Sequence, residues 1–576
     1  MLVDEYRVGT GRQFWSPFGQ TVFKNQIDSD GTYPTEAQAI SSGASNASKP
    51  LRNKVSNRLV VTDHPHNPLY NPDNNDAVAA GQWAANYFEH YFNDETRPMF
   101  YEPFNEPFVH SSEYAEILEP WEHNTPGRIY AGLDAQGVKE YVTDIHNEIG
   151  KAFDARPELD NVYVLGYGSA WPSFELWDFD HWNSRQKMFM DGAGANVDSF
   201  SIHLYDGINI EGQENKRSGS NSMAILDLIE TYSMTKWDVV KPHSITEYGN
   251  IVAQATPDYS ERDNSQAIKT YNHIMLELME REENILTSVP FITGYAEFTW
   301  QATGHPYNPA LFRPNPENIE SYIADNKGDD DASNDVIKWR FKSDENIVGD
   351  KYLLTKKHLF LEFWKDVDGT RAHYDNTDPD VQIASYVNGN KAYVIMSNLE
   401  DGDKELQLNL AAMTGYNYES VKIERLKVPF NSGAELTEAT HVLTSDVDGA
   451  DLALGEITLD RYETVKYTFT LNQDIENTAT MQRKTYYSDE HLLDITANTA
   501  NTFTVNNIDL TTLDTNNSTA NIRLSFGRDI ALSTAPTLTV NGTAVSVPDD
   551  WAGYDQADRT EFFGAIDVPV DFALLT

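Results

Sequence analysis

The most constraining feature is the regular alternation of short apolar runs with helix-like segments up to about residue 370. Alternating strands and helices are typical of a parallel α/β sheet, and at this length a (β/α)8 barrel is the leading interpretation. The predicted strands are residues 11–18, 58–66, 98–107, 161–171, 198–207, 241–250 and 292–300. The predicted helices are residues 77–92, 138–153, 223–234, 265–282 and 351–367.

Polar and aromatic residues gather where these predicted strands end, as in NEPFVH, IHLYD and TEYGN. A strand interior has no use for so many polar groups. A barrel builds its active site at the carboxyl ends of its strands. The barrel interpretation therefore explains a pattern that a generic α/β sheet leaves odd.

The pattern changes near Asp378, after which alternating strands follow one another without helical spacing. Asn388 and Gly389 form a typical hairpin turn between two of them. A second all-β stretch, rich in Thr and Asn, begins near Ile475. The sequence thus predicts a catalytic barrel at 1–372, a β-sandwich at 378–472 and a second, truncated β-sandwich at 475–576.

Composition excludes several functional classes. The 576 residues carry a net charge of −46, which repels nucleic acid and anionic membranes, and there is no Cys for disulfides or thiol chemistry. No apolar run approaches the roughly 20 residues of a membrane span. The acidic loops lack calcium-loop spacing, and DHPHNP has no helix-borne partner for zinc. We expect no metal, no cofactor and a monomer.

Glu106, in FYEPFNEPFVH, and Glu247, in SITEYG, each end a predicted strand, 141 positions apart (247 − 106). A lone Glu at a strand end is more often an ion-pair partner or a helix cap. Two of them, both in aromatic surroundings, fit the carboxylate pair of glycoside hydrolysis, in which one carboxyl donates a proton and the other attacks or activates water. Asn105, His203, Tyr205 and Trp300 stand near these strand ends as sugar contacts or nucleophile-orienting groups, although each is also an ordinary core residue type.

The segments RQFWSP, YEPFNEPFVH, SIHLYD and ITEYGN, with two trailing β-domains, resemble glycoside hydrolase family 86 of clan A, which contains β-agarases and β-porphyranases. The resemblance covers essentially the whole chain. It implies a retaining, endo-acting hydrolase of β-1,4-galactosidic bonds in a red-algal galactan, with agarose favoured over porphyran. Glu106 would be the general acid/base and Glu247 the nucleophile.

The same resemblance places Asn105, His203, Tyr205 and Trp300 in the −1 subsite. Candidates for further sugar contacts are His64, His66, His110, Trp15 and Trp171, of which the first two are also explained as turn caps. Arg12, Arg185 and Arg217 are available for a basic pocket that would accept a sulfated chain.

The barrel of this clan needs three strands before the acid/base strand, and only two are predicted here. We therefore expect the first strand to be missing from this chain, and the full-length protein to be secreted, periplasmic or on the cell surface. Two alternatives remain open from the sequence. One is a clan A hydrolase of another polysaccharide, and the other is an inactive barrel that only binds carbohydrate.

Overall fold

The computed structural model describes most of the chain. The described residues are 2–9, 11–14, 17–19, 33–47, 57–63, 76–109, 111–112, 133–251, 261–324, 336–343, 350–410, 413, 415–428, 439–447, 456–476, 481–511, 513–514 and 518–575. None of the helices in these ranges is long and apolar enough to cross a membrane.

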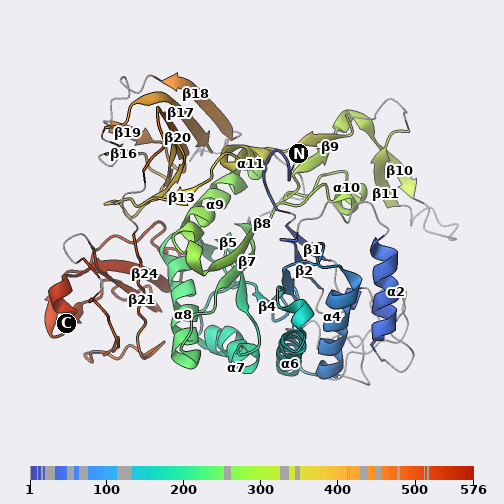
Figure 1. The fold of residues 1–576 in the computed structure, drawn as a ribbon, viewed down its shortest axis with the longest axis horizontal. Coiled ribbons are helices and arrows are strands. Elements are labelled where there is room, and N and C mark those ends of the chain that lie inside the picture. Colours follow the sequence, from blue (N-terminus) through green and yellow to red (C-terminus); the bar gives the residue numbers. More distant parts are fainter. Residues whose placement is uncertain are drawn as a thin grey trace.

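A curled parallel sheet forms the centre of the N-terminal region (Figure 1). Its spatial order β1-β2-β3-β4-β5-β7-β8 repeats the order in the chain, and the short β6 pairs antiparallel with β5. Within the described residues β1 is not paired with β8, so the barrel is open there. The predicted fold class is confirmed, with two strands before β3. The strands are β1 Arg12–Phe14, β2 Val60–Thr62, β3 Phe100–Glu102, β4 Tyr163–Ser169, β5 Ser199–Ile208, β6 Glu214–Asn215, β7 His243–Asn250 and β8 Ile285–Pro290.

Helices cover the outer face of this sheet (Figure 1). Asp76 and Asp134 cap α4 and α6 by accepting from the backbone N–H three residues on, at 3.0 and 2.8 Å. A Cβ added to Gly81 would lie 2.5 Å from the Glu148 carbonyl oxygen, so only glycine lets these two helices approach so closely. The helices are α2 Glu36–Ala47, α4 Ala77–Tyr91, α6 Ala135–Asp154, a π-helical turn at Trp182–Lys187, α7 Met188–Ala193, α8 Ser220–Trp237 and α9 Glu261–Met279.

Two predicted elements near the end of the barrel are wrong. The predicted strand at 292–300 contains the short helix α10 (Glu297–Thr303), and the last parallel strand is β8, which ends before it. The aromatic residues of this segment suit a strand, but Ala296 has a φ of +40° and breaks the extended run. The predicted helix at 351–367 begins with strand β12 (Tyr352–Leu354) and is helical only as α11 (His358–Trp364).

The chain between β8 and α11 forms an excursion from the barrel. Strand β9 (Phe312–Pro314) pairs with β12, and β10 (Ile319–Ala324) pairs with β11 (Val336–Phe341). Helix α10 packs against β11 within this excursion. This excursion interrupts the strand–helix alternation on which the sequence prediction rests.

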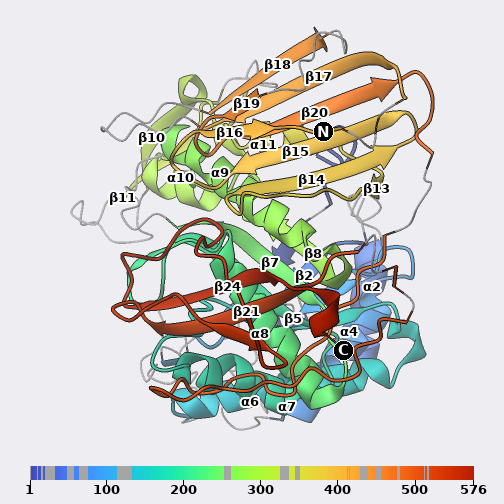
Figure 2. The ribbon, with the colours of Figure 1, turned by 90° about the vertical axis from the view of Figure 1, so that its left-hand side faces the viewer.

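A six-stranded antiparallel sheet and a two-stranded one make up the first all-β domain (Figure 2). The order in the larger sheet is β13-β14-β15-β20-β17-β18, and β16 pairs with β19. The predicted hairpin is present, with Gly389 at φ +57° between β14 and β15. The strands are β13 Thr370–Arg371, β14 Val381–Asn388, β15 Lys391–Asn398, β16 Lys404–Gln407, β17 Tyr418–Lys427, β18 Thr440–Val447, β19 Glu456–Leu459 and β20 Thr464–Leu471.

The last all-β region packs against α8 of the barrel (Figure 2). Strand β21 (Asn521–Asp529) pairs with β24 (Glu561–Pro569), and β22 (Leu538–Val540) forms a hairpin with β23 (Thr543–Val545). The all-β stretch predicted from Ile475 onward is wrong over residues 492–510, where the described residues form only the isolated bridge Ser488↔Val505. β-type residues without a partner strand cannot satisfy a ladder of backbone hydrogen bonds.

Candidate active site

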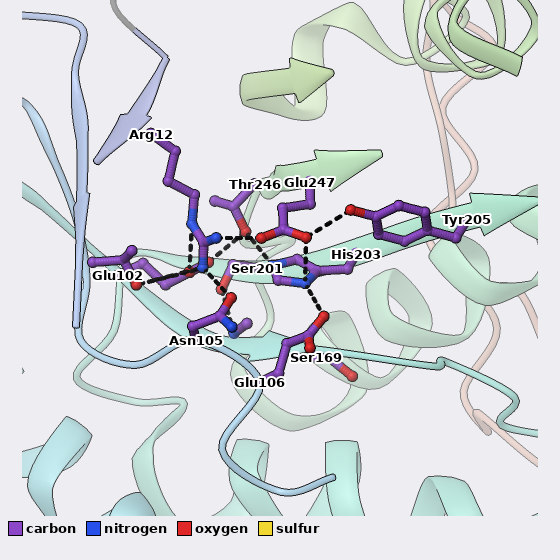
Figure 3. A network of polar contacts seen from close by, with 12 residues as sticks. Arg12, Glu102, Asn105, Glu106, Ser169, Ser201, His203, Tyr205, Thr246 and Glu247 are labelled. Carbon is purple, nitrogen blue, oxygen red and sulfur yellow. Dashed lines mark hydrogen bonds and ion pairs between the residues drawn. The ribbon is translucent and has the colours of Figure 1, made fainter. Parts of the chain in front are cut away.

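The curled sheet brings Glu106 and Glu247 together, although β4 and β5 lie between their strands (Figure 3). Glu106 follows β3, and Glu247 lies within β7. A carboxylate oxygen of Glu106, a carboxylate oxygen of Glu247 and a ring nitrogen of His203 all lie within 4.8 Å of one another. Both carboxylates are partly accessible, with 21 % and 12 % of the side chain exposed. The sequence-predicted pair is therefore one site.

His203, on β5, lies between the two carboxylates (Figure 3). Its Nδ1 is 2.7 Å from Glu106 Oε1 and 3.6 Å from Glu247 Oε2, while Nε2 is 3.1 Å from Thr246 Oγ1. Burial lowers the pKa of His203, but the carboxylates of Glu247 and Glu106 outweigh it and raise that pKa above its usual value. A proton held on Nδ1 is donated to Glu106, while the charge of the imidazolium also stabilises the nearby carboxylate of Glu247.

Tyr205, two residues further along β5, donates its hydroxyl to Glu247 Oε2 at 2.7 Å. Burial and the nearby charge of Glu247 raise the pKa of Tyr205 well above its usual range. The phenol thus keeps its proton and remains a donor to Glu247 at any working pH.

Arg12, from β1, lies on the opposite side of Glu247 from Tyr205 and supplies positive charge to the site (Figure 3). Its side chain is only 6 % exposed, contacts both Glu102 and Glu247, and donates to Asn105 Oδ1 at 2.6 Å. Burial lowers the pKa of Arg12, but Glu102 and Glu247 raise it above its usual value overall. Arg12 therefore remains a cation shared by two carboxylates.

Glu102, in β3, is fully buried and accepts from three sides. Arg12 Nε donates to it at 3.0 Å, Thr62 Oγ1 at 3.2 Å, and Thr246 through its hydroxyl. Burial raises the pKa of Glu102, whereas Arg12, then His203 and Thr246, lower it below the usual value overall. Because Thr246 also contacts His203, the network connects Glu102 with the carboxylate pair.

The backbone around Glu106 is held in an uncommon conformation, with a φ of +47°. Gly168 of β4 packs beneath this turn: an added Cβ would lie 2.8 Å from the Phe104 carbonyl oxygen and 3.3 Å from Glu106 N. Asn105 N donates to the Asp63 carbonyl oxygen at 2.9 Å. The turn that presents Glu106 is thus fixed from both neighbouring strands.

The structure gathers five of the predicted residues in one network: Asn105, Glu106, His203, Tyr205 and Glu247. It does not add Trp300, because the indole is fully buried on α10 against Phe341 and is not available to a sugar. Trp171 lies just after β4, partly exposed, with a φ of +51°. Four predictions lie outside the described residues: Trp15, His64, His66 and His110.

Sequence reasoning misses the roles of Arg12, Glu102 and Thr246. The sequence suggests Arg12 only as a source of positive charge, although it lies in the first predicted strand. Glu102 is in the same short motif as Glu106, and a charged residue inside an apolar strand is the available signal. Thr246 carries no signal of its own.

Glu106, His203 and Glu247 also offer the ligand types of a divalent-metal site. Arg12 already contacts Glu247, so a positive charge stands where a metal ion would bind. Like charges this close repel, which favours a proton on His203 over a metal ion as the group between the carboxylates.

Comparison with known proteins identifies the family. Residues 380–493 match the family model "Porphyranase beta-sandwich domain 1", and residues 502–576 match "beta porphyranase A C-terminal". The chain is 34 % identical over 582 residues to beta-porphyranase A of Phocaeicola plebeius, which covers 99 % of this chain and 69 % of that protein. A solved beta-porphyranase of glycoside hydrolase family 86, from the human gut bacterium Bacteroides plebeius, has 32 % identity and a TM-score of 0.76, covering 100 % of this chain and 88 % of that one. The chain belongs to glycoside hydrolase family 86.

The family 86 assignment confirms the resemblance seen in the motifs and makes this chain a glycoside hydrolase. A second solved family 86 structure, in complex with neoagarooctaose, has a TM-score of 0.79 at 27 % identity and covers 100 % of this chain and 87 % of that one. A beta-porphyranase and a protein in complex with neoagarooctaose thus share this fold over the whole of this chain.

Proposed function

We propose that this family 86 chain is the catalytic part of a retaining endo-hydrolase that cleaves β-galactosidic bonds in a red-algal galactan. The observation that carries the proposal is the carboxylate pair Glu106 and Glu247, with His203 between them and ligand atoms within 4.8 Å of one another. Retaining enzymes place the two carboxyl groups about 5–5.5 Å apart, whereas inverting enzymes leave about 6.5–9.5 Å for a water. The short separation supports retention.

In the first step Glu106 donates a proton to the leaving glycosidic oxygen, and Glu247 attacks the anomeric carbon. Tyr205 and Arg12 each hold one oxygen of Glu247, which orients the attacking lone pair. As Glu247 becomes an ester it loses its charge, and Arg12 remains neutralised by Glu102. The buried cation therefore has a partner throughout the reaction.

Charge moves between the two carboxyl groups during this step. Glu247 becomes neutral while Glu106 becomes a carboxylate, and His203 Nδ1, 2.7 Å from Glu106 Oε1, is placed to donate to that carboxylate. In the second step Glu106 takes a proton from water, and the resulting hydroxide releases the sugar from Glu247 with its original configuration. Glu106 is then protonated again and ready for the next cycle.

Porphyran is the favoured substrate and agarose the second, which reverses the order expected from sequence. Two porphyranase family models match this chain, and beta-porphyranase A of Phocaeicola plebeius is 34 % identical to it, which supports this order. A basic pocket for sulfate does not include Arg12 or Arg217, since both are buried and Arg217 bonds Ser173 and Asn221. Because a polysaccharide cannot cross a membrane intact, we place the reaction outside the cytoplasm.

Azide rescue of two variants tests the roles directly. Wild type should release reducing ends from porphyran, from agarose, or from both. Glu247→Ala should lose nearly all activity, and azide should yield a glycosyl azide of inverted configuration. Glu106→Ala should lose most activity on substrates with poor leaving groups. With azide it should yield a glycosyl azide of retained configuration. Full activity in Glu247→Ala would remove the proposal.

A further inference from the structure

Three aromatic rings lead away from the nucleophile and end at the surface. Phe291 follows β8, and its ring centroid lies 6.1 Å from that of Tyr205, the residue bonded to Glu247. Tyr307 lies 6.3 Å from Phe291, and Phe298 lies 6.2 Å from Tyr307. We call Phe291, Tyr307 and Phe298 the aromatic strip.

The inner part of the strip is held by the backbone. Phe291 N donates to the Tyr248 carbonyl oxygen at 2.8 Å, one residue after Glu247. Thr293 N donates to the Pro309 carbonyl oxygen at 3.0 Å and Leu311 N to that of Thr293 at 2.8 Å. These bonds pair the segment that carries Phe291 with the segment that carries Tyr307. The two rings are therefore positioned relative to the catalytic strand β7.

The outer end of the strip is unusually exposed. Phe298 on α10 is 74 % exposed, the largest fraction of any large apolar side chain among the described residues. A single exposed apolar residue is ordinary, but this one ends a run of rings that begins at the nucleophile. Trp300, two positions along the same short helix, is fully buried. The helix therefore turns a different aromatic residue to solvent from the one predicted.

The charge of the nucleophile reaches the strip. Burial raises the pKa of the Tyr307 phenol, and the nearby carboxylate of Glu247 raises it further. Tyr307 thus keeps its phenol proton and stays neutral near the nucleophile.

We propose that the aromatic strip binds the glycone part of the polysaccharide chain, in subsites beyond the sugar that Glu247 attacks. This inference rests on the proposed function. The sugar that bonds to Glu247 is the glycone, and the strip begins at Glu247's partner Tyr205. A galactose ring carries several C–H groups on one face, and that apolar face fits flat on an exposed aromatic ring. The occupant is therefore a run of galactosyl rings of the polysaccharide chain.

A chain-length comparison tests the strip. The variants are Phe298→Ala, Phe298→Trp and a matched control, Tyr295→Ala, which removes a 49 % exposed aromatic of the same segment that packs on Tyr352 instead. Phe298→Ala should lower kcat/KM on a galactan octasaccharide by about tenfold, mainly through KM, because most of one ring's burial is lost. The same variant should leave kcat/KM on a galactan tetrasaccharide nearly unchanged. Phe298→Trp should restore the octasaccharide value.

Binding is measured separately so that the two proposals fail separately. In a Glu247→Ala background, calorimetry with the octasaccharide should show about tenfold weaker binding after Phe298→Ala and none of this loss after Tyr295→Ala. Equal binding with and without Phe298, or an equal loss in the Tyr295 control, overturns the strip. A wild-type enzyme that cleaves no galactan overturns the proposed function, while the binding result still decides the strip.

Discussion

Replacing Glu102 by Gln removes one negative charge from a fully buried network while keeping its shape. Arg12 loses one of its two carboxylate partners, and the new amide presents an N–H where Arg12 or Thr246 already donates. Breaking a buried ion pair by removing one partner costs about 3–5 kcal/mol. Because Arg12 keeps Glu247 and Asn105, we expect about 2–3 kcal/mol, a fall in Tm of about 3–6 °C.

The same change should slow the reaction. With Glu102 neutral, Arg12 is drawn wholly to Glu247 and withdraws charge from the attacking oxygen, so we expect kcat to fall by about 10–100-fold, the value of one strong charged hydrogen bond. Melting curves and reducing-end release from porphyran measure both effects. Glu175→Gln is the matched control, because Glu175 forms another fully buried pair, with Arg559. It should lower Tm without changing kcat.

The contribution of Glu102 to the stability of the fold should depend on pH. The pKa of Glu102 is lowered in the folded protein, so its stabilising contribution is present above the usual value of 4.5 and is lost as pH falls through the lowered pKa. The difference in Tm between wild type and Glu102→Gln should therefore shrink at acidic pH. A difference that is constant with pH, together with an unchanged kcat, would refute the network as an electrostatic positioning element.

Three further predictions follow from contacts in and around the site. Tyr205→Phe removes a 2.7 Å hydrogen bond to Glu247 and should lower kcat by about 10–100-fold with little loss of Tm, measured by steady-state kinetics. The raised pKa of His203 stabilises the fold below its usual value of 6.5, and this contribution is lost as pH rises through the raised pKa; a His203→Asn variant should lack that alkaline loss in Tm. Arg559→Met leaves Glu175 buried without a cation and should cost about 3–5 kcal/mol, and limited proteolysis should then cut the last all-β region first.

Each of these has a contrary result. An unchanged kcat in Tyr205→Phe would mean that the phenol does not hold the nucleophile. Parallel Tm–pH curves for wild type and His203→Asn would show that folding does not shift the pKa of His203. Wild-type resistance to protease in Arg559→Met would show that the last all-β region does not depend on this ion pair.

The repeated strand–helix pattern is sufficient to predict the parallel sheet and most of its helices, because period-2 and period-3.6 spacing are local properties of the sequence. The Asn388–Gly389 hairpin is predictable for the same reason. The excursion after β8 is not, since β9 pairs with β12 and β10 with β11 in an order that no local pattern records. The segment at 492–510 has strand-type residues but no partner strand in the described structure.

Part of the site is predictable because chemistry restricts which residues can act. Two carboxylates at strand ends, with His203 and Tyr205 on the strand between them, form a combination that few reactions besides glycoside hydrolysis require. The role of Arg12 escapes sequence reasoning, because it depends on which strands meet in space. Trp300 shows the opposite limit: its residue type fits a sugar platform, but a two-residue shift around α10 decides which ring, Trp300 or Phe298, faces solvent.

The most direct test of the central claim is the configuration of the first product. Proton NMR recorded during the first minutes of porphyran or agarose hydrolysis, before mutarotation, distinguishes the two anomers at the new reducing end. A retaining reaction through Glu106 and Glu247 predicts that the β-anomer forms first and the α-anomer grows in later. An initial α-anomer would contradict the covalent role of Glu247, and no new reducing end from either polymer would contradict the galactan substrate.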